Sequence, residues 1–145
     1  MNIERLKDQI MINEGVRKKA YKDTLGNWTT GVGHLIKRPD EDYLIKKELN
    51  DDELNIIFNN DLNQAIDDAR KFINENSIDE VAFEIVIDMA FNLGYPRLSQ
   101  FKNFHQALLE KDYIKASDEM LDSLWAKQLP NRAGRLSLLM REIDA

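Results

Sequence analysis

The sequence predicts a mostly helical α+β fold with a small antiparallel sheet near the N-terminus. Residues 50–73 carry an apolar stripe at helical spacing, and residues 79–94 are apolar on nearly all sides, as in a buried central helix. Residues 17–36 instead form short runs rich in β-branched and aromatic residues and broken by glycine, which is typical of strands and turns. A sheet segment followed by a run of helices indicates the α+β class.

The first helix is expected over residues 2–14. Asn2 can cap its N-terminus, and apolar residues recur at helical spacing after it. Gly15 is a natural end, because glycine adopts the left-handed conformation that follows many last turns. The sheet comes next, with a turn near Leu25, Gly26 and Asn27.

Residues 36–49 are charged and contain Pro39, which predicts a loop with at most a short helix. The long helix begins at Asn50 and Glu53, which resemble a capping box. Three or four shorter helices are expected around residues 99–110, 113–125 and 130–142. The 145 residues form a single domain in this interpretation, with a small sheet-containing lobe (about 13–60), a helical lobe (about 61–145 plus the N-terminal helix) and the long helix joining them.

Composition excludes several classes of function. The chain has 26 acidic and 20 basic residues, a net charge of −6 that argues against nonspecific nucleic-acid binding. It has no cysteine, and His34 and His105 are far apart, so no zinc site is predicted and no cofactor is expected. No apolar run approaches the ~18 residues of a membrane span, and the N-terminus lacks a secretory apolar segment. We therefore expect a protein made in the cytoplasm, without stable membrane insertion.

Three side chains near the sheet carry the chemistry. Glu14 is expected in the last turn of a helix, where the helix dipole favours the protonated form that a general acid needs. Asp23 precedes a turn and Thr29 lies on the returning strand. Each has an ordinary structural explanation by itself. Together, two carboxyls in different environments with a hydroxyl between them are the set used in glycoside hydrolysis.

Residues 14–34, EGVRKKAYKDTLGNWTTGVGH, resemble the active-site segment of the T-even phage lysozymes, glycoside hydrolase family 24. The shared pattern begins with Glu-Gly and has an Asp separated from that Glu by eight residues. A Thr and the sequence Gly-x-Gly-His follow. The resemblance continues in DDELNIIFNNDL, DMAFNLG and LWAKQLPNRAGR, and covers nearly the whole chain. It implies a lysozyme-like fold and a muramidase that cuts the β-1,4 bond between N-acetylmuramic acid and N-acetylglucosamine in peptidoglycan.

The resemblance also implies residue roles. Glu14 would protonate the leaving oxygen, while Asp23 and Thr29 would hold and activate the attacking water, with inversion. Arg132 would approach and support Glu14. Leu35 and Phe91 match substrate-binding positions of the cleft, although both could equally be core residues.

Asp61 lies in the apolar stripe of the long helix, where a carboxylate without a partner is costly, or at the edge of that stripe, where water would solvate it. The resemblance places it opposite His34. We therefore expect an ion pair that joins the sheet to the long helix and raises the pKa of His34.

The same family implies a monomeric phage or prophage endolysin that acts in host cell lysis. It would bind peptidoglycan glycan strands and need a holin for release from the host cytoplasm. A lytic transglycosylase that cuts the same bond is the nearest alternative, against which Asp23 and Thr29 argue. A catalytically silent wall-binding module is the second alternative.

Overall fold

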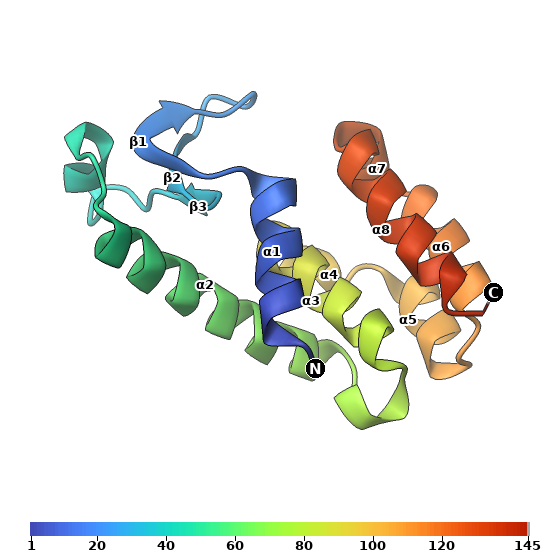
Figure 1. Cartoon of the computed structure of the whole chain (residues 1–145). Helices are drawn as coiled ribbons and strands as arrows, with labels where there is room; N and C mark the ends of the chain where they lie inside the picture. The colour runs from blue at the N-terminus through green and yellow to red at the C-terminus, as the bar shows by residue number, and fades with distance from the viewer. Residues whose placement is uncertain (145) are drawn as a thin grey trace. The chain divides into compact units, whose positions relative to one another are not determined.

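The computed structural model describes residues 1–144 and is mostly helical, with one small antiparallel sheet (Figure 1). This confirms the predicted α+β class. In chain order the elements are α1 (Ile3–Glu14), β1 (Arg17–Lys22), β2 (Trp28–Gly31), β3 (His34–Leu35), η1 (Asp42–Lys46), α2 (Asp51–Phe72), η2 (Glu75–Ser77), α3 (Glu80–Leu93), α4 (Tyr95–Leu98), α5 (Lys102–Leu109), α6 (Tyr113–Leu121), α7 (Leu124–Gln128) and α8 (Pro130–Glu142), where η marks a 3₁₀ helix.

The chain forms two compact units. Residues 2–64 make up the sheet unit, and the residues from Ala65 onward, together with Met1, make up the helical unit. The boundary falls inside α2. The division into lobes within a single domain stays a prediction.

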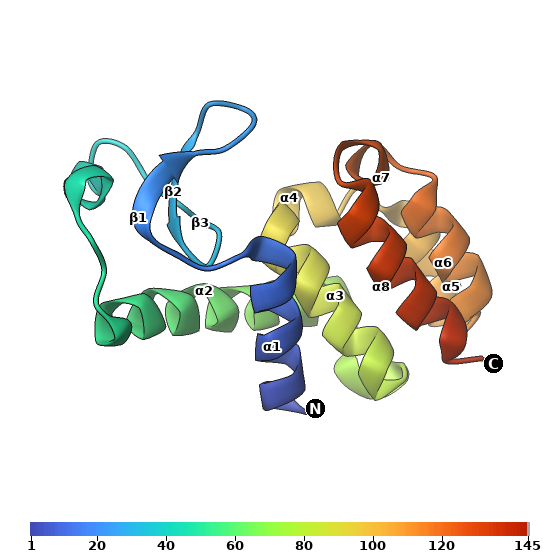
Figure 2. The ribbon, with the colours of Figure 1, turned by 45° about the horizontal axis from the view of Figure 1, so that its top comes forward.

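The sheet unit contains α1, the strands, η1 and the first part of α2. The strands follow the order β1-β2-β3, and all pairs are antiparallel. Tyr21 pairs with Thr29, and the register shifts between Arg17 and Tyr21. On the other side of β2, Thr30 pairs with His34. The connection between β1 and β2 projects beyond the paired strands (Figure 2).

Helix ends in this unit follow the predicted signals. Asn2 caps α1 by accepting a hydrogen bond from Arg5 N at 3.0 Å. The start of α2 is a capping box, in which the side chains of Asn50 and Glu53 each accept from the other's backbone N–H at 2.8 and 3.0 Å. These bonds satisfy backbone donors that the first helical turn leaves without partners.

The helical unit is built around α3 and α8. Helix α8 packs against α3, α6 and α7, and α5 packs against α6. Asp79 caps α3, and most of that helix is buried, as its apolar sequence predicts. The helical segment expected around residues 113–125 is divided into α6 and α7. Asp122 and Ser123 leave helical conformation, and the Ser123 side chain caps α7 by accepting from Ala126 N at 3.1 Å.

Candidate active site

Glu14 is the last residue of α1 and lies against the turn that joins β2 to β3. A Cβ atom at position 33 would overlap Oε2 of Glu14 and lie 2.7 Å from its Cδ and 3.0 Å from its Cγ. Gly33 also has a φ of +62°, a conformation that side chains with a Cβ rarely adopt. The glycine therefore lets the Glu14 side chain approach the backbone of this turn.

Asp23 is fixed by the turn that it opens. Its Oδ1 accepts hydrogen bonds from the backbone N–H groups of Leu25 at 2.9 Å and Asn27 at 2.8 Å. The backbone closes the same turn, since Asp23 N donates to Asn27 O at 2.9 Å. Within residues 1–144, Oδ2 of Asp23 makes no hydrogen bond. One carboxylate oxygen thus orients the group and the other can accept from a ligand or water.

Thr29 is buried on β2, and its hydroxyl donates to Asn27 O at 3.3 Å. Asn27 therefore links the two water-holding candidates, because it donates to Asp23 through its N–H and accepts from Thr29 through its C=O. The Thr29 oxygen keeps its lone pairs for a hydrogen bond from water.

The pKa of Tyr21 responds to the charges of both Glu14 and Asp23. Tyr21 lies opposite Thr29 in the sheet, and the charges of both Glu14 and Asp23 act on its hydroxyl. Partial burial raises the pKa of Tyr21, the Arg17 guanidinium opposes this, and the two carboxylates raise it further. Tyr21 thus pairs with Thr29 in the sheet, and both carboxylates lie within electrostatic range of its hydroxyl.

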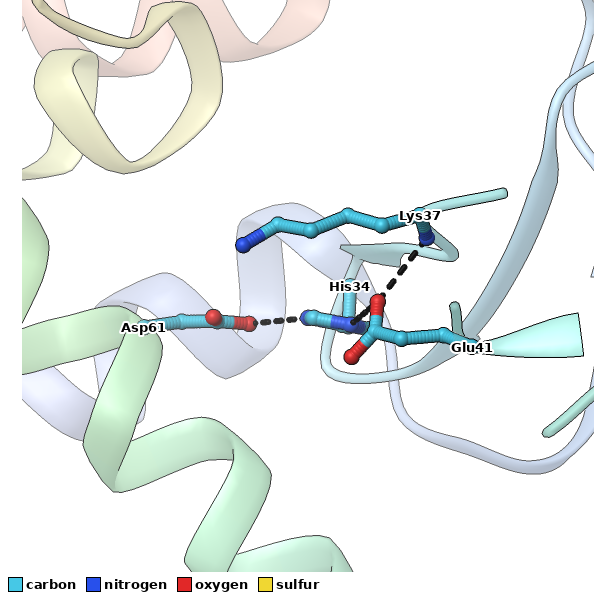
Figure 3. A network of polar contacts seen from close by, with 4 residues as sticks. All are labelled: His34, Lys37, Glu41 and Asp61. Carbon is cyan, nitrogen blue, oxygen red and sulfur yellow. Dashed lines mark hydrogen bonds and ion pairs between the residues drawn. The ribbon is translucent and has the colours of Figure 1, made fainter. Parts of the chain in front are cut away.

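His34 forms an ion-pair network with two carboxylates. Its Nδ1 lies 2.7 Å from Asp61 Oδ2 and its Nε2 lies 3.0 Å from Glu41 Oε1 (Figure 3). An ionised carboxylate can only accept, so the protonated imidazole, which donates from both ring nitrogens, is the form that satisfies both contacts. The hydrogen bond to Asp61 raises the pKa of His34, burial opposes it, and the charges of Asp61 and Glu41 add to the rise. The expected His34–Asp61 pair is present.

Glu41 was not found by sequence reasoning. It lies in a charged loop, and no periodicity singles it out among its acidic neighbours. Its Oε1 also accepts from Lys37 N at 2.8 Å. Partial burial works to raise the pKa of Glu41, but the hydrogen bonds from Lys37 N–H and His34, with the charge of His34, outweigh burial and lower it.

Arg132 lies in the helical unit, where it is buried against Asp88. Its Nε and Nη2 donate to Asp88 Oδ1 at 3.0 and 2.5 Å, and Nη2 also donates to the Asp88 carbonyl at 3.2 Å. Asp88 is fully buried. A carboxylate inside the nearly apolar 79–94 segment was a signal that a cationic partner exists. The expected approach of Arg132 to Glu14 stays a prediction.

The two expected substrate-binding residues differ in exposure. Leu35 on β3 is 55% exposed, which is unlike a core residue, whereas Phe91 near the end of α3 is half-buried. Their contact with substrate stays a prediction. A surface pocket of about 290 Å³ between α4 and α7 contains none of the expected site residues.

The sequence matches the family model described as phage lysozyme over residues 12–141. The chain belongs to the phage lysozyme family. It is 29% identical over 156 residues to a probable T4-type lysozyme 2 and 28% identical over 160 residues to a probable T4-type lysozyme 1, both from Dictyostelium discoideum, with 92% of each chain covered. It is also 30% identical over 152 residues to the pre-baseplate central spike protein Gp5 of Enterobacteria phage T4, covering 88% of this chain and 26% of that protein.

Membership of this family supports a lysozyme or endolysin function, which is that of a glycosidase. The geometry of the sheet unit is compatible with this chemistry, since it provides a proton donor, a carboxylate with one available oxygen, and a hydroxyl. Among residues 1–144, no cluster of three or more His, Asp or Glu side chains has the arrangement of a metal site. None of the helices described is long and apolar enough to cross a membrane.

Proposed function

We propose that the protein is a muramidase that hydrolyses the β-1,4 bond between N-acetylmuramic acid and N-acetylglucosamine in peptidoglycan, with inversion at the anomeric carbon. The observation that carries the proposal is the Asp23 turn. The turn holds one oxygen of a carboxylate, leaves the other for water, and fixes Thr29 through the same residue, Asn27. This arrangement suits the activation of water better than direct attack by the carboxylate.

The reaction follows from these roles. Glu14 gives its proton to the glycosidic oxygen as the bond from that oxygen to the anomeric carbon breaks. A water held by Asp23 and Thr29 attacks the anomeric carbon from the opposite face, and Asp23 takes its proton. The products are an α-configured reducing end and a free hydroxyl on the leaving sugar. For such a mechanism the two carboxyls stand roughly 6.5–9.5 Å apart, which leaves room for the water.

The biological role belongs to the same proposal. A phage or prophage endolysin of this kind acts on glycan strands of the host wall as a monomer. It waits in the host cytoplasm until a holin releases it. The sequence motifs shared with the phage lysozymes support this role.

Product analysis on purified peptidoglycan tests the proposed chemistry. We expect muropeptides with ordinary reducing ends, and proton NMR of the first-formed product should show the α-anomer. An initial β-anomer would overturn inversion, and a 1,6-anhydro product would identify a lytic transglycosylase. Absence of any cleavage would favour a wall-binding module.

Glu14→Gln provides the matching variant, because it keeps the shape of the side chain and removes the acid. Turnover should fall by about 10²-fold or more. Glu4→Gln, an exposed glutamate in the first turn of the same helix, is the control and should retain activity. Wall lysis by Glu14→Gln near the wild-type rate would reject Glu14 as the acid.

A further inference from the structure

Tyr21 is the sheet partner of one candidate catalytic residue and lies within electrostatic range of the other two. It is the direct partner of Thr29 across the β1–β2 pair, and the charges of Glu14 and Asp23 both act on its hydroxyl. No other tyrosine among residues 1–144 pairs with Thr29 or is affected by the charges of both carboxylates. Tyr43, for example, lies on η1 and is 67% exposed.

The ring of Tyr21 is held by Arg17. The guanidinium carbon of Arg17 lies 4.2 Å from the centroid of the Tyr21 ring. A cation at this distance over an aromatic face is attracted by the ring's quadrupole. Arg17 and Tyr21 lie at the two ends of the register shift in β1, so the irregular strand and the stacking contact occur together. The stack restricts the orientation of the phenol.

The hydroxyl of Tyr21 is available as a donor. Tyr21 is half-buried, and within the described part of the chain its hydroxyl makes no hydrogen bond. Thr30 Oγ1 is the only buried side-chain oxygen or nitrogen among residues 1–144 that lacks a hydrogen bond, so the Tyr21 hydroxyl is open to solvent and can be reached by a ligand. The phenol is protonated at neutral pH, because its ordinary pKa is 10.0 and burial and the two carboxylates raise the pKa further. The structure therefore presents a neutral O–H group near two acids, with its ring fixed from one side.

We propose that Tyr21 binds the substrate at the bond that is cut, with its hydroxyl donating a hydrogen bond to a sugar oxygen, and that Arg17 is a positioning residue that orients the ring. This inference rests on the proposed glycosidase function and adds a residue to it. A neutral donor suits a sugar hydroxyl, ether or acetamido oxygen, which carries no charge. It also adds no positive charge, which would favour the deprotonated form of a neighbouring carboxyl group.

Tyr21→Phe tests the hydroxyl alone, because it keeps the ring under Arg17. One neutral hydrogen bond is worth about 3–10-fold in affinity. We therefore expect kcat/KM on a soluble peptidoglycan oligosaccharide to fall by about 3–10-fold, mostly through KM, with the melting temperature little changed. Tyr43→Phe removes a hydroxyl elsewhere in the same unit and should leave both constants unchanged. Equal kinetics for Tyr21→Phe and wild type would overturn the proposal.

A double-mutant cycle tests the role of Arg17. Arg17→Met should raise KM by a similar factor, and Arg17→Met combined with Tyr21→Phe should add little, because the two residues act through one hydroxyl. Arg17→Lys keeps the charge without the planar group and should restore only part of the affinity. Additive effects of the two substitutions would show that Arg17 does not act through Tyr21.

Direct binding separates this inference from the proposed function. Calorimetric titration of Glu14→Gln protein with the same oligosaccharide should give a weaker Kd when Tyr21→Phe is added. If wild type cleaves but Tyr21→Phe changes neither Kd nor KM, only the role of Tyr21 fails. If wild type does not cleave, the proposed function fails, and the comparison of Kd values still supports or rejects Tyr21 as a ligand-binding residue.

Discussion

Gly33 lies directly against the side chain of Glu14, so that even a methyl group at position 33 would overlap the carboxylate. The close approach gives a physical reason for glycine in the Gly31-Val32-Gly33-His34 turn. It also connects Glu14 to the His34 network, because His34 follows Gly33 in the chain and is held by Asp61 and Glu41.

Gly33→Ala should displace the Glu14 carboxylate. We expect a loss of at least about 10-fold in kcat, since small displacements of a catalytic group are costly. The left-handed backbone adds a stability cost of about 1–2 kcal/mol. Steady-state kinetics and urea unfolding measure the two effects.

Gly94→Ala is the control, because Gly94 has a similar φ of +74° but only Pro96 Cδ, at 3.9 Å, near a new Cβ. It should lose stability without the loss of kcat attributed to Glu14. Unchanged kcat in Gly33→Ala would show that the contact does not position the acid.

Glu41→Gln should lower the pKa of His34 toward its ordinary value of 6.5, because one of the two carboxylates on the ring is removed. Titration of the imidazole resonances by NMR measures this directly. Asp42→Asn serves as the control, since Asp42 pairs with Arg38 rather than with His34. A His34 pKa that is the same in Glu41→Gln and wild type would contradict the network.

The His34–Glu41 pair should stabilise the fold over a defined pH range. Because the pKa of His34 is raised in the folded protein, the contribution of His34 to the free energy of unfolding is complete below pH 6.5. This contribution is lost as pH rises through the raised pKa. Because the pKa of Glu41 is lowered in the folded protein, the contribution of Glu41 to the free energy of unfolding is complete above pH 4.5. This contribution is lost as pH falls through the lowered pKa. Denaturant unfolding at a series of pH values should therefore show the largest difference in free energy of unfolding between wild type and Glu41→Gln from pH 4.5 to pH 6.5.

Thr30→Val should stabilise the protein. The Thr30 hydroxyl is fully buried opposite His34 and has no hydrogen-bond partner among residues 1–144. Replacing it with a methyl group of similar size removes an unsatisfied polar atom, for a gain of about 1–2 kcal/mol. Thr29→Val is the comparison and should destabilise, because its hydroxyl donates to Asn27 O. Urea unfolding measures the free energy of unfolding of both variants and of wild type. A lower free energy of unfolding in Thr30→Val than in wild type would contradict the expectation.

Arg132→Met should destabilise the protein by about 3–5 kcal/mol, since it takes a buried cation from the fully buried Asp88. Combining it with Asp88→Leu should recover much of this loss, because the buried carboxylate that Arg132 neutralises is then removed as well. Thermal and urea unfolding of the single and double variants measure the coupling. A double variant as unstable as Arg132→Met alone would show that the buried charge is not the cause.

Local signals in the sequence predicted much of the fold. Asn2 and Gly15 bound α1, and the Asn50–Glu53 box starts α2, because capping depends on residues within a few positions of each other. The break at Ser123 was missed because the apolar spacing continues across it. Pairing between distant segments is different: Asp88 has its partner 44 positions away, so sequence spacing alone could not identify it.

The candidate site divides in the same way. Glu14, Asp23 and Thr29 lie close together in the sequence and were found from one segment, with the family resemblance. Glu41 and Tyr21 were missed, because their places depend on a loop that folds back and on strand register. These are properties of the folded chain, which residue type and local spacing do not specify.

The shared contact with Asn27 makes the orientation of the Asp23 carboxylate depend on the residue at position 29. A substitution that removes the Thr29 hydroxyl also removes a hydrogen bond to Asn27, the residue whose N–H orients the Asp23 carboxylate. The cost of a change at one position therefore depends on the residue present at the other, a form of epistasis. Variants that acquire a new residue at position 29 would need a compensating change in the loop at residues 24–28 to keep the carboxylate in place.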